Sequence, residues 1–88
     1  MKMLMLLMLA VDGASTSAPD VQLLDFSAGY CGPCQQMVPI LQQMETAGYP
    51  IRKIDITEDP ELARRFKVDR IPTFVLLVEG QEVERFVG

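Results

Sequence analysis

The chain of 88 residues contains no histidine, no tryptophan and only two cysteines, Cys31 and Cys34. A structural zinc site takes four cysteine or histidine ligands, so these absences argue against a metal site built by this chain. Eight lysine and arginine residues stand against twelve aspartate and glutamate residues, which gives a formal net charge of −4. The shortage of positive charge argues against nucleic-acid binding, which depends on basic surfaces.

Long apolar runs are also missing. The longest uncharged apolar stretch covers residues 3–11, whereas a transmembrane helix needs about 20 residues. The sequence shows no internal repeat, no low-complexity tract and no glycine-rich phosphate-binding loop. What it has is 49% apolar and 23% charged residues, a globular composition. The length allows one small domain.

The first 20 residues differ from the rest. Lys2 precedes the apolar stretch, and small residues follow it to Ala18. This order is typical of a secretory signal peptide, although one lysine is a short basic region and Asp12 lies close to the apolar core. We interpret residues 1–20 as a leader and linker, and residues 21–88 as the domain. The alternatives are a first β-strand of the domain or a cloning remnant. If residues 1–18 are a signal peptide, the protein is exported to a compartment such as the periplasm; otherwise it is cytoplasmic.

The two cysteines lie where a strand turns into a helix. Residues 21–27 are apolar and strand-like, and after Cys34 apolar residues recur with helical spacing at Met37, Ile40, Leu41 and Met44. Pro33 suits a first helical turn, where its missing N–H is not needed. On such a turn, Cα atoms three residues apart are roughly 5–5.5 Å apart, inside the disulfide range of about 4.4–6.8 Å. The disulfide can therefore open and close without rebuilding the backbone.

The position of each cysteine predicts its role. Cys31 falls at the helix N-terminus, where free N–H groups and the helix dipole favour a thiolate. Cys34 lies one turn inside the helix and is more sheltered. We therefore expect Cys31 to attack a substrate disulfide and Cys34 to resolve the mixed disulfide. The alternatives are a static structural disulfide and one half of a metal site.

Asp25 interrupts the apolar strand six residues before Cys31. A carboxylate on a covered strand is unfavourable unless it is paired or protonated. One interpretation is a buried proton acceptor for Cys34. The other is a structural aspartate satisfied by local hydrogen bonds, and the spacing alone does not choose between them.

The remaining pattern predicts a helix over residues 34–47 that contains Pro39, a strand over 51–56, a short helix from the Asp59 cap to about Lys67, and strands over 74–78 and 81–87. Pro72 enters an apolar strand, which suits either a cis peptide bond or an ordinary loop proline. The order strand–helix–strand–helix–strand–strand predicts an α/β fold. Its mixed sheet of about four strands contains a parallel pair and a terminal antiparallel hairpin, and helices cover its faces.

In this order, the motifs resemble the thioredoxin family. The resemblance runs from about Val21 to Gly88 and rests on Asp25-Phe26, Cys31-Gly32-Pro33-Cys34, Pro39, Lys53 with Asp55, Ile71-Pro72-Thr73, Gly80 and Gly88. A single C-x-x-C motif is weak evidence, but several motifs in the right order are specific.

The resemblance implies a thioredoxin-like fold and a thiol–disulfide oxidoreductase that reduces or exchanges protein disulfides through Cys31 and Cys34. It also implies that Asp25 assists Cys34, that Lys53 lies near Asp25, and that the bond before Pro72 is cis. A substrate groove would be lined by Tyr30, Gly32, Pro33, Ile71 and Pro72. No cofactor is implied beyond the Cys31–Cys34 disulfide, and no metal or nucleic acid. The implied partners are protein disulfide substrates and a thioredoxin-reductase-like or membrane electron donor, and the implied state is a monomer.

Three features depart from the family pattern. Tyr30 stands where a tryptophan usually precedes the first cysteine. The family's first strand and helix have no counterpart before Val21. Its last helix, which covers one face of the sheet, has none before Gly88, so the domain resembles a C-terminally incomplete thioredoxin with apolar side chains left exposed. The missing elements favour an alternative function, a non-catalytic thioredoxin-like docking module of a larger exported protein.

We predict that deleting residues 1–18 leaves the thermal stability and the disulfide-reducing activity nearly unchanged. The reason is that a parallel connection between strands usually takes a dozen or more residues, and residues 12–20 are too few and read as a linker. The measurement is the melting temperature and activity of both forms. A large drop in melting temperature would show instead that the segment packs on the sheet.

Overall fold

The computed structural model describes residues 18–88, so the leader and most of the linker lie outside the described residues. Six elements follow in the order β1 (Val21–Ser27), α2 (Gly32–Thr46), β2 (Ile51–Asp55), α3 (Pro60–Arg65), β3 (Thr73–Val78) and β4 (Gln81–Val87). The predicted order of strands and helices is confirmed. Among residues 18–88, no helix has both the length and the apolar character needed to cross a membrane.

The four strands form one mixed sheet in the order β2-β1-β3-β4. β1 runs parallel to β2 and antiparallel to β3, and β3 pairs with β4 as a hairpin. β1 is therefore a central strand, as its nearly continuous apolar sequence predicts. The charged strand β4 lies at one edge, which also agrees with its sequence.

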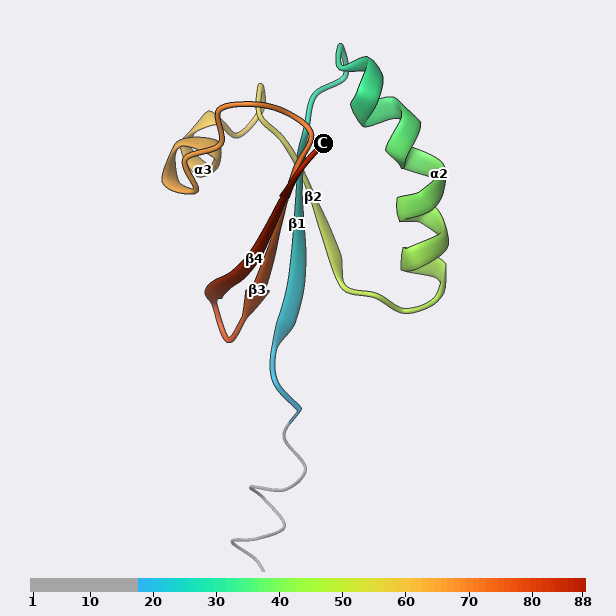
Figure 1. Ribbon diagram of the computed structural model, residues 1–88, viewed down its shortest axis with the longest axis vertical. Helices are drawn as coiled ribbons and strands as arrows, with labels where there is room; N and C mark the ends of the chain where they lie inside the picture. Colours follow the sequence, from blue (N-terminus) through green and yellow to red (C-terminus); the bar gives the residue numbers. More distant parts are fainter. Residues whose placement is uncertain (1–17) are drawn as a thin grey trace, which may run out of the picture.

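The two helices lie on opposite sides of the sheet (Figure 1). On the α3 side, Leu24, Phe26 and Val75 are buried to 1% exposure or less and pack with Ile54 and Ala63 as the main core. Burying a side chain the size of leucine or phenylalanine stabilises a fold by roughly 1.5–3 kcal/mol. This core covers the α3 side of the sheet, and the cysteines lie on the opposite side, at the start of α2.

Both ends of α2 have capping structures. Cys31 is the N-cap residue, so the helix begins at Gly32 and not near Cys34 as predicted. At the other end, the Gly48 N–H donates to the Glu45 carbonyl and the Tyr49 N–H to the Met44 carbonyl, the pattern of a Schellman motif. Gly48 has φ +98°, a conformation that glycine adopts without steric penalty.

Two other boundaries differ from the sequence prediction by one or two residues. β2 ends at Asp55 because the Asp55 carboxylate accepts the Thr57 N–H, which turns the chain. The short helix α3 begins after the Asp59 cap as predicted, but ends at Arg65, since Lys67 adopts a left-handed φ of +55°. Neither difference changes the topology.

On the α2 side, the described residues leave an apolar groove of about 500 Å³ between the helix and strands β1, β3 and β4. Its walls include Leu23, Met37, Leu41, Phe74 and Phe86. Phe86 is 55% exposed, so the expected exposure of apolar strand residues is confirmed. The same groove reaches Pro33 and Pro72 at the end that carries the cysteines.

Candidate functional site

Cys31 and Cys34 form a disulfide at the start of α2, with their Cα atoms 5.2 Å apart. This distance agrees with the spacing predicted for a first helical turn. Both residues are buried, with 7% and 4% exposure. The site is therefore a sheltered pair of sulfur atoms at the end of a helix.

The backbone around Cys31 is suited to a negative charge on its sulfur. The Cys34 N–H donates to the Cys31 sulfur at 3.1 Å, in the place where an N-cap side chain accepts. When the disulfide is reduced, the same N–H and the helix dipole favour a thiolate at Cys31. The local geometry thus agrees with the predicted role of Cys31 as the nucleophile.

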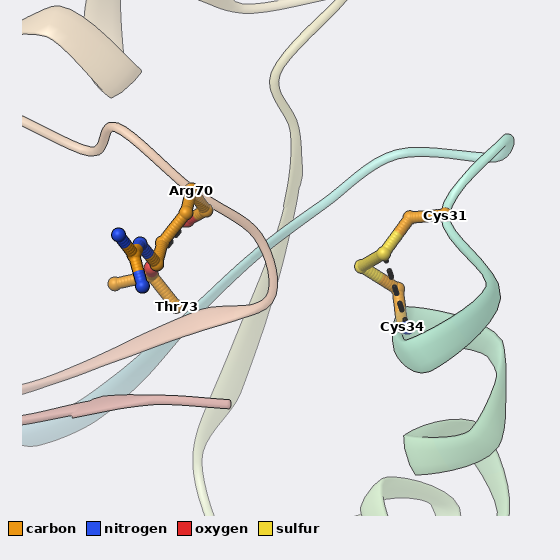
Figure 2. Close-up of a disulfide and its surroundings, with 4 residues drawn as sticks. All are labelled: Cys31, Cys34, Arg70 and Thr73. Atoms are coloured by element: carbon orange, nitrogen blue, oxygen red, sulfur yellow. Dashed lines mark hydrogen bonds between the residues drawn. A yellow bond between two sulfur atoms is a disulfide. The ribbon is translucent and has the colours of Figure 1, made fainter.

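A loop at residues 70–73 faces the disulfide, and the sulfur atoms point toward it (Figure 2). The Ile71–Pro72 peptide bond in this loop is cis, as predicted. The buried Thr73 hydroxyl donates to the Arg70 carbonyl at 2.5 Å, which closes the loop. Pro72 and Pro33 line the same groove, so the loop and the first turn of α2 border one opening.

Asp25 is buried, with 4% exposure. Side chains alternate along a strand, so Asp25 points to the same α2 side as Leu23. Burial raises the pKa of the Asp25 carboxyl above its ordinary value of 3.8, Lys53 lowers it, and Glu45 raises it. Burial outweighs the attraction of Lys53, so the carboxyl holds its proton to a higher pH than an exposed aspartate does.

Lys53 is the direct partner of Asp25 on the neighbouring strand β2, which agrees with the resemblance. Its ammonium also forms an ion pair with Glu45 of α2, at an Nζ–Oε1 distance of 3.3 Å. Sequence reasoning missed Glu45. The available signal was its spacing, since eleven residues after Cys34 correspond to about three helical turns and place Glu45 on the same side of α2.

The five residues predicted to line a substrate groove differ in their exposure and in the side of the sheet that they face. Tyr30 is 74% exposed, and Gly32 is the first residue of α2. The Ile71 side chain packs against the core on the α3 side, so Ile71 can face an incoming chain only with its backbone. Of the five predicted groove residues, Pro33 and Pro72 line the apolar groove.

The arrangement is suited to a two-electron exchange between a dithiol and a disulfide. The sulfur atoms lie side by side, a helix N-terminus favours the attacking thiolate, and a proton-holding carboxyl lies on the same side of the sheet. Within residues 18–88, no three acidic or cysteine side chains are grouped so that they could hold a metal ion.

Comparison with known proteins agrees with this chemistry. The Thioredoxin family model matches residues 13–88. The thioredoxin of Mycobacterium tuberculosis is 40% identical over 82 residues, which cover 90% of this chain and 69% of that protein. The structure of thioredoxin NaTrxh from Nicotiana alata superposes with a TM-score of 0.76 at 36% identity, covering 92% of this chain and 71% of that one. A mutant thioredoxin from Halobacterium salinarum gives a TM-score of 0.73 at 41% identity, covering 78% of this chain. The match spans 62% of the halobacterial chain.

We predict that Asp25→Ala makes the oxidised protein more stable than the wild type at neutral pH. Because the pKa of Asp25 is raised on folding, its favourable contribution is complete below about pH 4 and is lost as the pH rises through the folded-state value. The advantage of the variant should grow over that window by about 1.4 kcal/mol per unit of pKa shift and then level off. The measurement is the denaturant midpoint of both proteins across the pH range. A difference that does not change with pH, or a variant less stable at neutral pH, would favour the structural interpretation of Asp25.

Proposed function

The chain belongs to the thioredoxin family, and on this premise we propose that it is a thiol–disulfide oxidoreductase that reduces or exchanges disulfides of other proteins. The observation that carries the proposal is the hydrogen bond from the Cys34 N–H to the Cys31 sulfur at the start of α2. In the reduced protein, this bond favours a negative charge on the Cys31 sulfur over the Cys34 sulfur. A purely static disulfide does not need such a difference.

The proposed reaction begins with the reduced dithiol. The Cys31 thiolate attacks one sulfur of a substrate disulfide, the substrate S–S bond breaks, and the released substrate thiolate takes up a proton. Cys34 then loses its proton and attacks the Cys31 sulfur, which breaks the mixed disulfide and releases the second substrate thiol. Two electrons pass to the substrate, and the Cys31–Cys34 disulfide remains. The two cysteines carry both electrons, so the proposal includes no cofactor.

Asp25 is the proposed acceptor of the Cys34 proton. Its carboxyl is buried on the α2 side of the sheet, and burial raises its pKa above the ordinary value. The carboxylate is therefore a stronger base than that of an exposed aspartate. Lys53, its partner on β2, opposes this effect by lowering the pKa of the Asp25 carboxyl. The two residues together set the pH at which Cys34 is activated.

The proposed substrate-binding residues are Tyr30, Gly32, Pro33, Ile71 and Pro72. Because the Ile71 side chain points into the core, the backbone of Ile71 is the part available to a substrate. An extended substrate segment can pair with such a backbone as an added strand. The exposed Tyr30 ring and the Pro33–Pro72 opening would contact the side chains that flank the substrate disulfide.

Repeated turnover requires that the Cys31–Cys34 disulfide be reduced again. A thioredoxin-reductase-like protein or a membrane electron donor is the proposed source of electrons, and the protein is proposed to work as a monomer. The potential of the compartment and the donor together set the direction of the reaction.

The alternative is a docking module that uses the fold without its chemistry. Such a module has no need of both cysteines, whereas this chain keeps the pair at a helix start, facing the loop at residues 70–73. The comparisons do not support the docking interpretation.

We predict that Cys34→Ser traps mixed disulfides between Cys31 and protein substrates, because the resolving thiol is missing. Cys31→Ser, the matched control, keeps one cysteine in the same helical turn but loses the nucleophile, and should trap none. The measurement is the yield of reducible adducts with insulin, together with the rate of insulin reduction coupled to dithiothreitol. Wild type should reduce insulin, and both variants should lose at least about 100-fold in rate. Cys31→Ser is slow because the nucleophile is gone, and Cys34→Ser because its mixed disulfide is not resolved.

Two results would contradict this proposal. One is a reduced wild type that does not reduce insulin above the dithiothreitol background. The other is adduct formation by Cys31→Ser in place of Cys34→Ser, which would exchange the roles of the two cysteines.

A further inference from the structure

Three ionisable side chains from three different elements lie on the α2 side of the sheet. Asp25 of β1 and Lys53 of β2 are direct partners in the parallel register. Glu45, in the last turn of α2, contacts the Lys53 ammonium at 3.3 Å. The ammonium thus forms an ion pair with a carboxylate on the helix, and its charge also acts on the buried carboxyl of the neighbouring strand.

The three groups differ in their contact with water. Asp25 is 4% exposed, whereas the side chains of Lys53 and Glu45 are 48% and 40% exposed. A lysine ammonium is a mobile point charge on a flexible chain, so the group that binds it determines where the charge lies. Here Glu45 binds the Lys53 ammonium at the solvent-exposed border of the site. The Asp25 carboxyl is buried and is not part of this ion pair.

We propose that Glu45 is a positioning residue for the disulfide exchange, which sets the proton affinity of Asp25 by holding the Lys53 ammonium at the solvent-exposed border. The inference rests on the proposed function, since it assigns a regulator to the proposed proton acceptor. Glu45 acts through Asp25 and Lys53 and does not touch the reacting sulfur atoms.

Two effects of Glu45 have the same sign. Its negative charge raises the pKa of Asp25 directly, while Lys53 lowers it. Removing the charge of Glu45 would also leave the Lys53 ammonium free to approach Asp25, which would lower that pKa further. The partner of Asp25 on β3 is the uncharged Phe74, and from α2 the charged group that acts on Asp25 is Glu45. The cysteines at the start of α2 carry no charge in the disulfide form.

The experiment is a titration of the Asp25 carboxyl by carbon-13 NMR in the oxidised full-length protein, where the cysteines do not titrate. Glu45→Gln keeps the shape of the side chain and removes its charge. It should lower the titration midpoint of Asp25 by about 0.2–0.7 pH unit, the range expected for a half-exposed ion pair. Lys53→Gln should raise the midpoint. In the Lys53→Gln background, Glu45→Gln should have a smaller effect than in the wild type, because the ammonium that Glu45 holds is gone.

Glu61→Gln is the matched control. Glu61 pairs with Arg64 in an exposed ion pair on α3, on the other side of the sheet, so its loss should leave the Asp25 midpoint unchanged. A second readout is the pH dependence of insulin reduction. In Glu45→Gln its acid limb should move to lower pH by the same amount as the Asp25 midpoint.

The outcomes separate this inference from the proposed function. An Asp25 midpoint that does not respond to Glu45→Gln, or responds equally with and without Lys53, overturns the role of Glu45 whatever the activity. A midpoint that moves while the acid limb stays in place also overturns it, since Glu45 would then have no effect on the exchange. A wild type that does not reduce insulin overturns the proposed function, and the titration still tests the electrostatic link by itself.

Discussion

The N–H of Cys34 donates to the sulfur of Cys31 at 3.1 Å, and the rest of the site depends on where this helical turn is held. The turn follows β1 directly: the Cys31 N–H donates to the Ala28 carbonyl at 3.1 Å, so the strand end determines the position of the helix start. β1 in turn lies between β2 and β3 and is covered by the core on the α3 side. The central strand β1 therefore determines where the two sulfur atoms lie, opposite the loop that contains Pro72.

The same strand carries the buried Asp25, and the pKa of its carboxyl depends on opposing effects. Burial alone would push the carboxyl toward its neutral form, and one adjacent ammonium alone would push it toward its charged form. The structure contains both influences and adds Glu45, which binds the ammonium. A buried group tuned by opposing neighbours is typical of functional sites, which often accept a loss of stability for their chemistry.

Local features of the site could be predicted from the sequence because they depend on residues close together in the chain. The geometry of Cys31 and Cys34 follows from one helical turn, and the Asp59 cap from three residues. Element ends were less accurate, because side chains such as that of Asp55 compete with the backbone for hydrogen bonds. The Glu45–Lys53 pair and the apolar groove beneath α2 could not be predicted, since both depend on how the helix lies over the sheet. The nearness of Lys53 to Asp25 came only from the family resemblance, and the strand register agrees with it.

We expect the start of α2 to make the two cysteine sulfur atoms chemically different in the reduced protein. The most direct test is a brief pulse of iodoacetamide on the reduced wild-type protein near pH 7, with the modified cysteine located by fragmentation mass spectrometry. Alkylation depends on the thiolate and on its access to solvent. We predict that iodoacetamide modifies Cys31 at least about 10-fold faster than Cys34, and that the reaction of Cys31 persists to lower pH. Modification of Cys34 first, or of both at equal rates, would contradict it.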